Sequence, residues 1–190
     1  GKLQEAADTF DQMLKKKPGA ALAAESALVR GRILEQLKQF DAALAMYDMV
    51  IEQHPKSRQM PDALWAAARL RDSLQQHKEA AALFQRLAKE CPQFAEIDAV
   101  LYKWAWALSD LGGKDQSSAV FEQLRNEHPK SSLWPDAVFR LAQRAYEAKN
   151  YARARELVTS LLAAKPAPAM RENALYLSGQ ISVAEEKWDE

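Results

Sequence analysis

Apolar residues recur along this chain at intervals of three and four, the spacing that places them on one face of an α-helix. The segment from Pro135 to Pro166 shows the pattern most clearly. Its first half places Leu141 and Ala142 on one stripe, and its second half, after a short polar turn, places Leu157 and Leu161 on another. This segment therefore predicts two helices that pack through their apolar stripes.

The same pattern returns every 37 residues, because four positions of the segment repeat without a slip. A proline ends each copy, a bulky apolar residue stands eight residues before it, and a small residue stands four residues earlier again. These rows are Pro18, Pro55, Pro92, Pro129 and Pro166; Phe10, Tyr47, Phe84, Phe121 and Val158; and Ala6, Ala43, Ala80, Ser117 and Ala154. A fourth row, of small residues in the first half, reads Gly31, Ala68, Ala105, Ala142 and Gly179. One period shared by four positions predicts a tandem array of stacked helix pairs.

We name the first helix of each predicted pair helix A and the second helix B. The predicted order is a lone helix B over residues 2–17, pairs over 20–55, 61–92, 96–129 and 135–166, and a last helix A over 170–187. Trp188 stands where the next helix B would begin. We interpret the chain as a single solenoid and as a fragment of a longer array. Its cut ends would expose apolar surface, which favours self-association.

Composition narrows the classes of function. Lys plus Arg and Asp plus Glu are 26 each, so the formal net charge is zero and nucleic-acid binding is disfavoured. The longest apolar stretch, residues 99–108, contains Lys103 and is too short to cross a bilayer, so no membrane insertion is expected. The 48% of hydrophobic residues suffices for one continuous core.

Small residues in helix A, an alanine and an aromatic residue four apart in helix B, and a proline eight residues later resemble the tetratricopeptide repeat. The matching residues are Gly31, Ala43, Tyr47 and Pro55; Leu64, Ala68, Ala80, Phe84 and Pro92; Leu101, Ala105, Ser117, Phe121 and Pro129; and Val138, Leu141, Ala142, Ala154, Val158 and Pro166. The departures are Arg30 and Ser178 where leucine is usual, Ser117 and Val158 as weaker copies, and a period longer than the family's roughly 34 residues.

The resemblance implies an all-α fold: a right-handed α-solenoid of antiparallel helix pairs, with about ten helices here and helix A lining a concave groove. It also implies a non-catalytic protein–protein interaction scaffold that binds a peptide or helix of a partner. The long loops followed by Pro-Asp-Ala look like the repeats of bacterial envelope proteins, which favours the periplasm or cell envelope. Two alternatives stay open: a structural spacer in an envelope assembly, and a polysaccharide-contacting scaffold of an exopolysaccharide export system.

Two rows of helix A residues form the candidate binding surface. The first reads Leu28, Trp65, Tyr102, Phe139 and Tyr176, and the second, one turn later, reads Arg32, Arg69, Trp106, Gln143 and Gln180. Aromatic rings suit the apolar anchors of a peptide, and arginines bind carboxylates through paired hydrogen bonds. The predicted partner-binding residues are Arg32, Trp65, Arg69, Tyr102, Trp106, Phe139 and Tyr176. A competing interpretation is that the rings only wedge between successive A helices.

The row before the prolines, Lys17, His54, Cys91, His128 and Lys165, resembles a set of metal ligands. Ligands of one ion lie within about 2.3 Å of it, whereas equivalent positions in stacked units are roughly 10 Å apart. We therefore expect polar helix ends and no metal site. Gly112-Gly113 lacks the lysine and glycine spacing of a phosphate loop, and the acid pairs at 185–186 and 189–190 have no nearby nucleophile. The sequence predicts neither an enzyme nor a cofactor.

Overall fold

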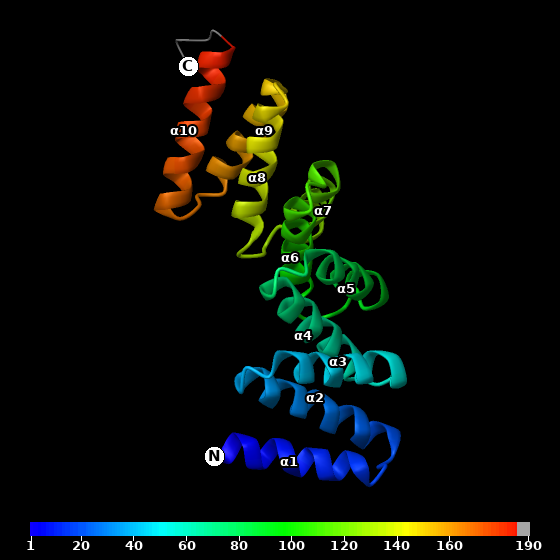
Figure 1. Cartoon of the computed structure of the whole chain (residues 1–190). Helices are drawn as coiled ribbons and strands as arrows, with labels where there is room; N and C mark the ends of the chain where they lie inside the picture. The colour runs from blue at the N-terminus through cyan, green and yellow to red at the C-terminus, as the bar shows by residue number, and fades with distance from the viewer. Residues whose placement is uncertain (186–190) are drawn as a thin grey trace. The chain divides into compact units, whose positions relative to one another are not determined.

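A computed structural model describes residues 1–185, which form ten α-helices and no strand (Figure 1). The helices are α1 (Lys2–Lys15), α2 (Ala20–Gln36), α3 (Phe40–Gln53), α4 (Met60–Ser73), α5 (His77–Glu90), α6 (Ile97–Asp110), α7 (Lys114–Glu127), α8 (Trp134–Glu147), α9 (Tyr151–Ala163) and α10 (Pro168–Ala184). The all-α class of paired helices predicted from the sequence is confirmed. The predicted end of the last helix A at residue 187, and Trp188, lie outside the described residues.

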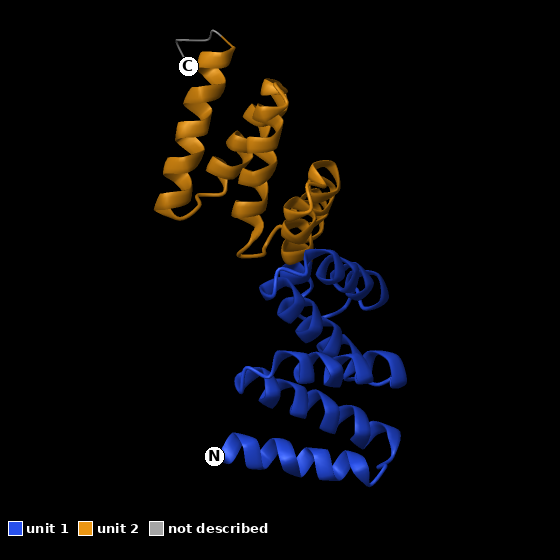
Figure 2. Cartoon of the chain, viewed as in Figure 1, with its two compact units in different colours: residues 1–100 blue, residues 101–190 orange. Residues whose placement is uncertain are grey.

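The chain divides into two compact units, residues 1–100 and 101–190 (Figure 2). In the first unit α1 packs on α2, α2 on α3, α3 on α4 and α4 on α5. In the second unit α7 packs on α8, α8 on α9 and α9 on α10. Within each unit, helices that follow one another in the chain are thus neighbours in space, as in a helical repeat.

The turn from helix A to helix B has the same conformation in all four pairs. One residue of each turn has a positive φ: Lys38 (59°), Gln75 (62°), Gly112 (78°) and Lys149 (59°). In the first turn the Lys38 N–H donates to the Glu35 carbonyl at 3.0 Å, and the Gln39 N–H donates to the Leu34 carbonyl at 2.9 Å. The other three turns make the same two bonds. This bonding satisfies the last carbonyls of each helix A and closes the hairpin.

The loop from helix B to the next helix A also repeats. Its middle residue is Ser57, Phe94 or Ser131, and the N–H of this residue donates to the carbonyl three residues earlier at 2.9, 2.9 and 3.0 Å. The carbonyl of the same residue accepts from the N–H three residues later, at 3.2, 3.1 and 3.1 Å. These two consecutive turns occur in three of the loops, whereas α2 and α10, which follow the other two loops, have 17 residues in place of 14 and begin earlier in their repeats.

The core is built by the rows that the sequence marks. Ala43, Ala80 and Ala154 are fully buried, as are the rings of Tyr47 and Phe84. The alanines let neighbouring helices approach closely, and the rings fill the space one turn further on. This alternation of small and large residues explains why both rows keep the same period.

Gly31 lies at a close contact between α2 and the Tyr47 ring of α3. A Cβ atom at Gly31 would lie 2.5 Å from Cε1 and 2.8 Å from Cδ1 of Tyr47. The absence of a side chain lets the Tyr47 ring lie against α2, where its hydroxyl donates to Glu35 at 2.8 Å. At Gly179, the equivalent residue of α10, nothing lies within 4 Å of such a Cβ atom.

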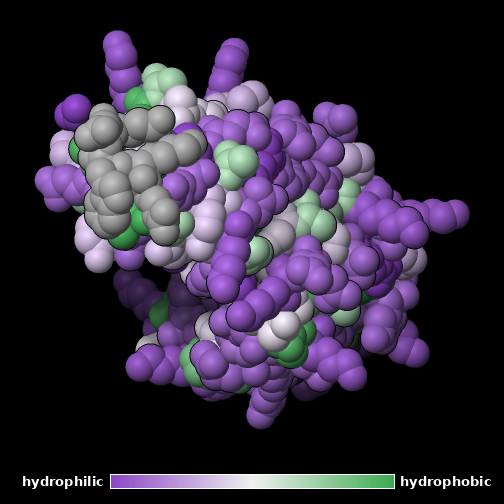
Figure 3. Space-filling model, turned by 90° about the horizontal axis from the view of Figure 1, so that it is seen from above, coloured by the Kyte–Doolittle hydropathy of each residue, from purple (hydrophilic) through white to green (hydrophobic). Residues whose placement is uncertain are grey.

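One face of the molecule is mainly polar (Figure 3). The face seen in Figure 3 is predominantly hydrophilic, with hydrophobic residues only in small separate spots. Among the described residues, none of the helices combines the length and the apolar character that a membrane span requires.

Candidate partner-binding surface

In the first unit, the predicted residues Arg32, Trp65 and Arg69 meet around one hollow of about 450 Å³. Arg32 comes from α2, and Trp65 and Arg69 come from α4, the next helix A of the array. Tyr47 of α3 and Glu96, just before α6, complete its wall. The structure therefore brings residues of both predicted rows to one place.

Trp65 is the anchor of this hollow. Its ring packs against Phe84 and Phe94, with ring centroids 5.8 and 6.3 Å away, and the residue is partly buried. The guanidinium carbon of Arg69 lies 5.7 Å from the centroid of the Trp65 ring, within range of a cation–π interaction. The two aromatic neighbours fix the indole ring while part of it faces the hollow.

The arginines of the hollow are paired with carboxylates of the same unit. Arg32 lies 3.4 Å from Asp62, and Arg69 lies 3.7 Å from Glu35, with arginine side chains 55% and 49% exposed. Exposed pairs of this kind contribute little to stability, about 0 to 1 kcal/mol. A carboxylate from a partner can therefore compete for either arginine.

The hydroxyl of Tyr47 has a fixed role at the edge of the hollow. Burial raises the pKa of Tyr47 well above its ordinary value, and the hydrogen bond to Glu35 raises it further. The hydroxyl therefore stays protonated and keeps donating to Glu35, which positions the carboxylate that faces Arg69.

In the second unit, Tyr102 and Trp106 of α6 form a similar cluster. Both rings pack against Phe121 of α7, with centroid distances of 6.0 and 6.2 Å, and they lie 6.3 Å from each other. The Tyr102 hydroxyl donates to Asp136 of α8 at 2.8 Å. Burial raises the pKa of Tyr102, and this hydrogen bond raises it further.

Arg140 of α8 belongs to this cluster, although the sequence analysis missed it. Its guanidinium carbon lies 4.9 Å from the centroid of the Trp106 ring, and its Nε lies 3.5 Å from Asp136. Arg140 stands outside both rows of the repeat, which is why the period did not reveal it. Arg140 stands four residues after Asp136, and this spacing in the sequence predicts an ion pair between them on one face of α8.

Phe139 and Tyr176 lie in opposite environments although they share one row. Phe139 is only 8% exposed, whereas Tyr176 is 72% exposed. Tyr176 lines a hollow of about 470 Å³ in the second unit together with Tyr146 and Gln180. The burial of Phe139 fits the competing interpretation, in which the ring wedges between helices.

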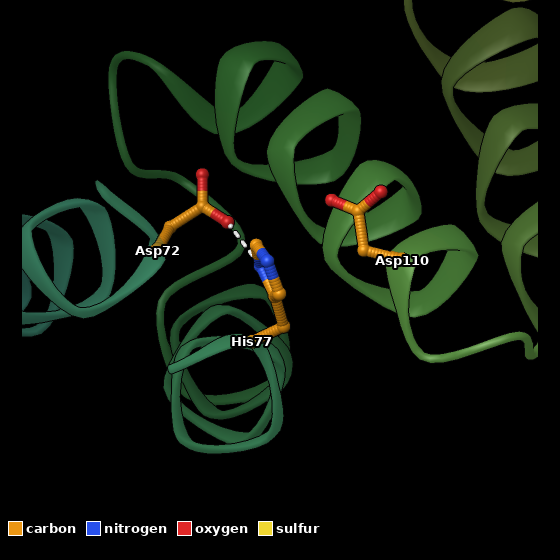
Figure 4. Close-up of side chains that lie close together, drawn as sticks. All are labelled: Asp72, His77 and Asp110. Atoms are coloured by element: carbon orange, nitrogen blue, oxygen red, sulfur yellow. Dashed lines mark hydrogen bonds and ion pairs between the residues drawn. The ribbon is translucent and has the colours of Figure 1, made fainter. Parts of the chain in front are cut away.

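A further polar contact lies at the turn between α4 and α5. Nδ1 of His77 lies 3.1 Å from Asp72, as Figure 4 shows, and Nε2 of His77 lies 3.1 Å from the side-chain oxygen of Gln75. Both contacts brace the turn in which Gln75 has its positive φ. Asp110, also labelled in Figure 4, belongs to α6 in the second unit.

Equal helix pairs that repeat one set of packing residues define a helical-repeat scaffold. The chain belongs to the tetratricopeptide repeat family, whose pattern matches residues 1–58, 28–93 and 102–171. Members of this family are typically non-catalytic scaffolds, and the fold supports a protein–protein interaction scaffold as the general class of this chain. No curated protein matches the chain.

Solved structures of other repeat proteins share this fold. YrrB, described as a tetratricopeptide repeat protein with an unusual peptide-binding site, is 15% identical; the match covers 96% of this chain and 87% of YrrB, with a TM-score of 0.68. The double mutant MamA RS-1 ArsTM is 14% identical over 85% of this chain and 84% of its own, with a TM-score of 0.65. PilF of Pseudomonas aeruginosa is 14% identical over 100% and 88%, with a TM-score of 0.64. At these identities the likeness shows the fold alone.

Proposed function

We propose that the chain binds a peptide or a helix of a partner protein on its A helices. The A-helix surface consists of Arg32, Trp65 and Arg69 in the first unit and of Tyr102, Trp106, Arg140 and Tyr176 in the second. The observation that carries the proposal is a half-buried tryptophan, braced by neighbouring aromatic rings, with an arginine stacked on it, in each of the two units. Tryptophan, tyrosine and arginine dominate the binding energy of protein interfaces.

The chemistry of the first unit favours a partner segment with one apolar side chain and a nearby carboxylate. Trp65 offers an apolar ring face that needs no ordering, because Phe84 and Phe94 already hold it. Arg32 and Arg69 are half exposed and paired only at 3.4 and 3.7 Å, so they can turn to a carboxylate of the partner. The peptide-binding site of YrrB, a protein of the same fold, supports a peptide as the class of partner.

Phe139 is left out of this proposed surface because its ring is buried. A structural spacer would use the packing rows equally well but would not need the arginines. The two functions therefore differ in how they respond to charge reversal on the A helices.

The test is a selection of peptides from a random library on the wild-type chain, followed by affinity measurements on variants. Arg32→Glu combined with Arg69→Glu should weaken the selected peptides by about tenfold or more, because two charges that attract a partner carboxylate become charges that repel it. Arg171→Glu is the matched control, because Arg171 is an exposed arginine outside the surface. Equal binding by the double variant and the wild type would contradict the proposal and favour a spacer.

A further inference from the structure

The first unit contains another hollow, of about 880 Å³, that shares no lining residue with the A-helix surface. It lies between the first two turns of α2 and the loop from α3 to α4, and we name it the loop hollow. Its floor is mainly apolar, with Ala21, Leu22 and Pro55 among its residues. Leu22 is 46% exposed and adds apolar surface to this floor.

Ser57 lines this hollow at a loop position where the next unit has an aromatic residue. Ser57 and Phe94 occupy the same position of two successive loops, and the two loops have the same pair of turns. The Phe94 ring packs against Trp65 of the preceding helix A, at a centroid distance of 6.3 Å. At Ser57 the loop has a small side chain in place of this ring, and Ser57 itself lines the hollow.

The Ser57 hydroxyl gives independent support. It is buried and has no hydrogen-bond partner among the described residues. A buried hydroxyl without a partner is unfavourable, so the Ser57 side chain does not stabilise the loop through a hydrogen bond. A site that must admit a ligand gives a reason for a small residue at this position.

The charges at the rim of the loop hollow favour an acidic ligand. Lys56 and Arg58 both line it, and neither forms an ion pair within residues 1–185. In that part of the chain every other arginine except Arg171 is paired with a carboxylate. Glu25 is the only acidic residue among the lining residues. Lys56 and Arg58 together carry more positive charge than Glu25 carries negative charge.

We propose that the loop hollow binds an aromatic side chain of a partner protein that is flanked by acidic residues. The ring covers Leu22 and Pro55 and lies beside Ser57, the loop position that Phe94 occupies in the next unit. The flanking carboxylates pair with Lys56 and Arg58. This site lies outside the A-helix surface, so it gives the scaffold a second and separate point of contact, and it does not depend on the function proposed above.

The direct test uses two peptide probes and backbone amide NMR of the 190-residue chain. The probes are N-acetyl-Asp-Phe-Asp-amide and N-acetyl-Lys-Phe-Lys-amide, each titrated to about 10 mM, the range in which so small a ligand binds. The acidic probe should shift amide signals of residues 20–25 and 53–59. The basic probe should bind about tenfold more weakly, because Lys56 and Arg58 repel it.

Ser57→Phe is the decisive variant, because it copies the residue that fills the next loop. It should abolish the shifts caused by the acidic probe and leave the thermal stability equal or higher. Ser131→Phe places the same substitution in the equivalent loop of the second unit and should leave the shifts of residues 20–25 unchanged. Lys56→Glu combined with Arg58→Glu should reverse the preference between the two probes.

Three results would overturn the proposal: no shift at residues 20–25 and 53–59, equal binding of the two probes, or unchanged binding by Ser57→Phe. If Ser57→Phe does not fold, Ser57→Leu fills the hollow with a smaller side chain and must still weaken the acidic probe. The charge reversal at Lys56 and Arg58 changes only exposed side chains. This double variant therefore tests whether Lys56 and Arg58 attract the acidic probe, whether or not Ser57→Phe folds.

Discussion

Gly31→Ala is the sharpest test of the packing described above. In the middle of a helix, replacing glycine by alanine alone stabilises a protein by about 0.5 to 1 kcal/mol. At Gly31 the new Cβ atom would lie 2.5 Å from Cε1 of Tyr47, so the ring has to move. The ring is fully buried, and its hydroxyl is bound to Glu35 at 2.8 Å. Overpacking at such a site costs about 1 to 3 kcal/mol, so we expect net destabilisation of about 0.5 to 2 kcal/mol.

Gly179→Ala is the matched control in the equivalent position of α10. Because nothing lies within 4 Å of the added Cβ atom, only the gain in helix propensity remains. This variant should be more stable than the wild type by about 0.5 to 1 kcal/mol. Urea unfolding followed by circular dichroism, read as the shift of the midpoint at constant slope, measures both effects.

Tyr47→Phe combined with Gly31→Ala tests whether the Tyr47 ring causes the destabilisation by Gly31→Ala. The double variant copies the pair Ala68 and Phe84 of the next unit, in which both residues are fully buried. Once the hydroxyl no longer ties the ring to Glu35, the ring can move away from the new methyl group. The double variant should therefore lose at least about 0.5 kcal/mol less than the sum of the two single variants. Stabilisation by Gly31→Ala, or a strictly additive double variant, would refute the reasoning.

Two further predictions concern the core and the pH dependence. Phe121→Ala should destabilise the chain by about 3 to 5 kcal/mol, because the Phe121 ring is only 5% exposed and contacts Tyr102 and Trp106. Val158→Ala, at the equivalent position of the next unit, should destabilise it by roughly half as much. The same urea assay measures both losses. Equal losses would contradict this. A hydrogen bond from Arg153 lowers the pKa of Glu156 in the folded chain. The pair therefore stabilises the fold at a pH above the pKa that Glu156 has in the unfolded chain. This stabilisation is lost as the pH falls through the lower pKa of Glu156 in the folded chain. Glu156→Gln should therefore lower Tm at about pH 7 and leave it unchanged at about pH 2, and an equal loss at both values would contradict the assignment.

The helices could be predicted from the sequence because their signals are local. Each helix pair is marked by apolar spacing, by prolines and by the period of the small and bulky rows. Ala80 and Phe84, one residue from each row, are both buried in the core. The placement of Arg32, Trp65 and Arg69 around one hollow also follows the period, since equivalent residues of successive A helices are neighbours.

The environment of each site residue could not be predicted, because other helices supply it. Phe139 and Tyr176 share a row, yet one is buried and the other is the most exposed large apolar residue of the described chain. Arg140 joins Trp106 through a contact between helices, which no spacing within one helix reveals. The loop hollow is formed by the start of α2 and the loop from α3 to α4 together, so no single stretch of the sequence reveals it.

The identical turns between helices A and B have a consequence for how the gene can change. Lys38, Gln75, Gly112 and Lys149 have the same left-handed conformation and stand 37 residues apart. Joining the chain after Lys38 directly to Gln76 would remove one whole unit and leave the same backbone geometry at the junction. Recombination between such points can therefore duplicate or delete a hairpin without creating a new kind of connection, and array length becomes a property that selection can adjust in whole steps.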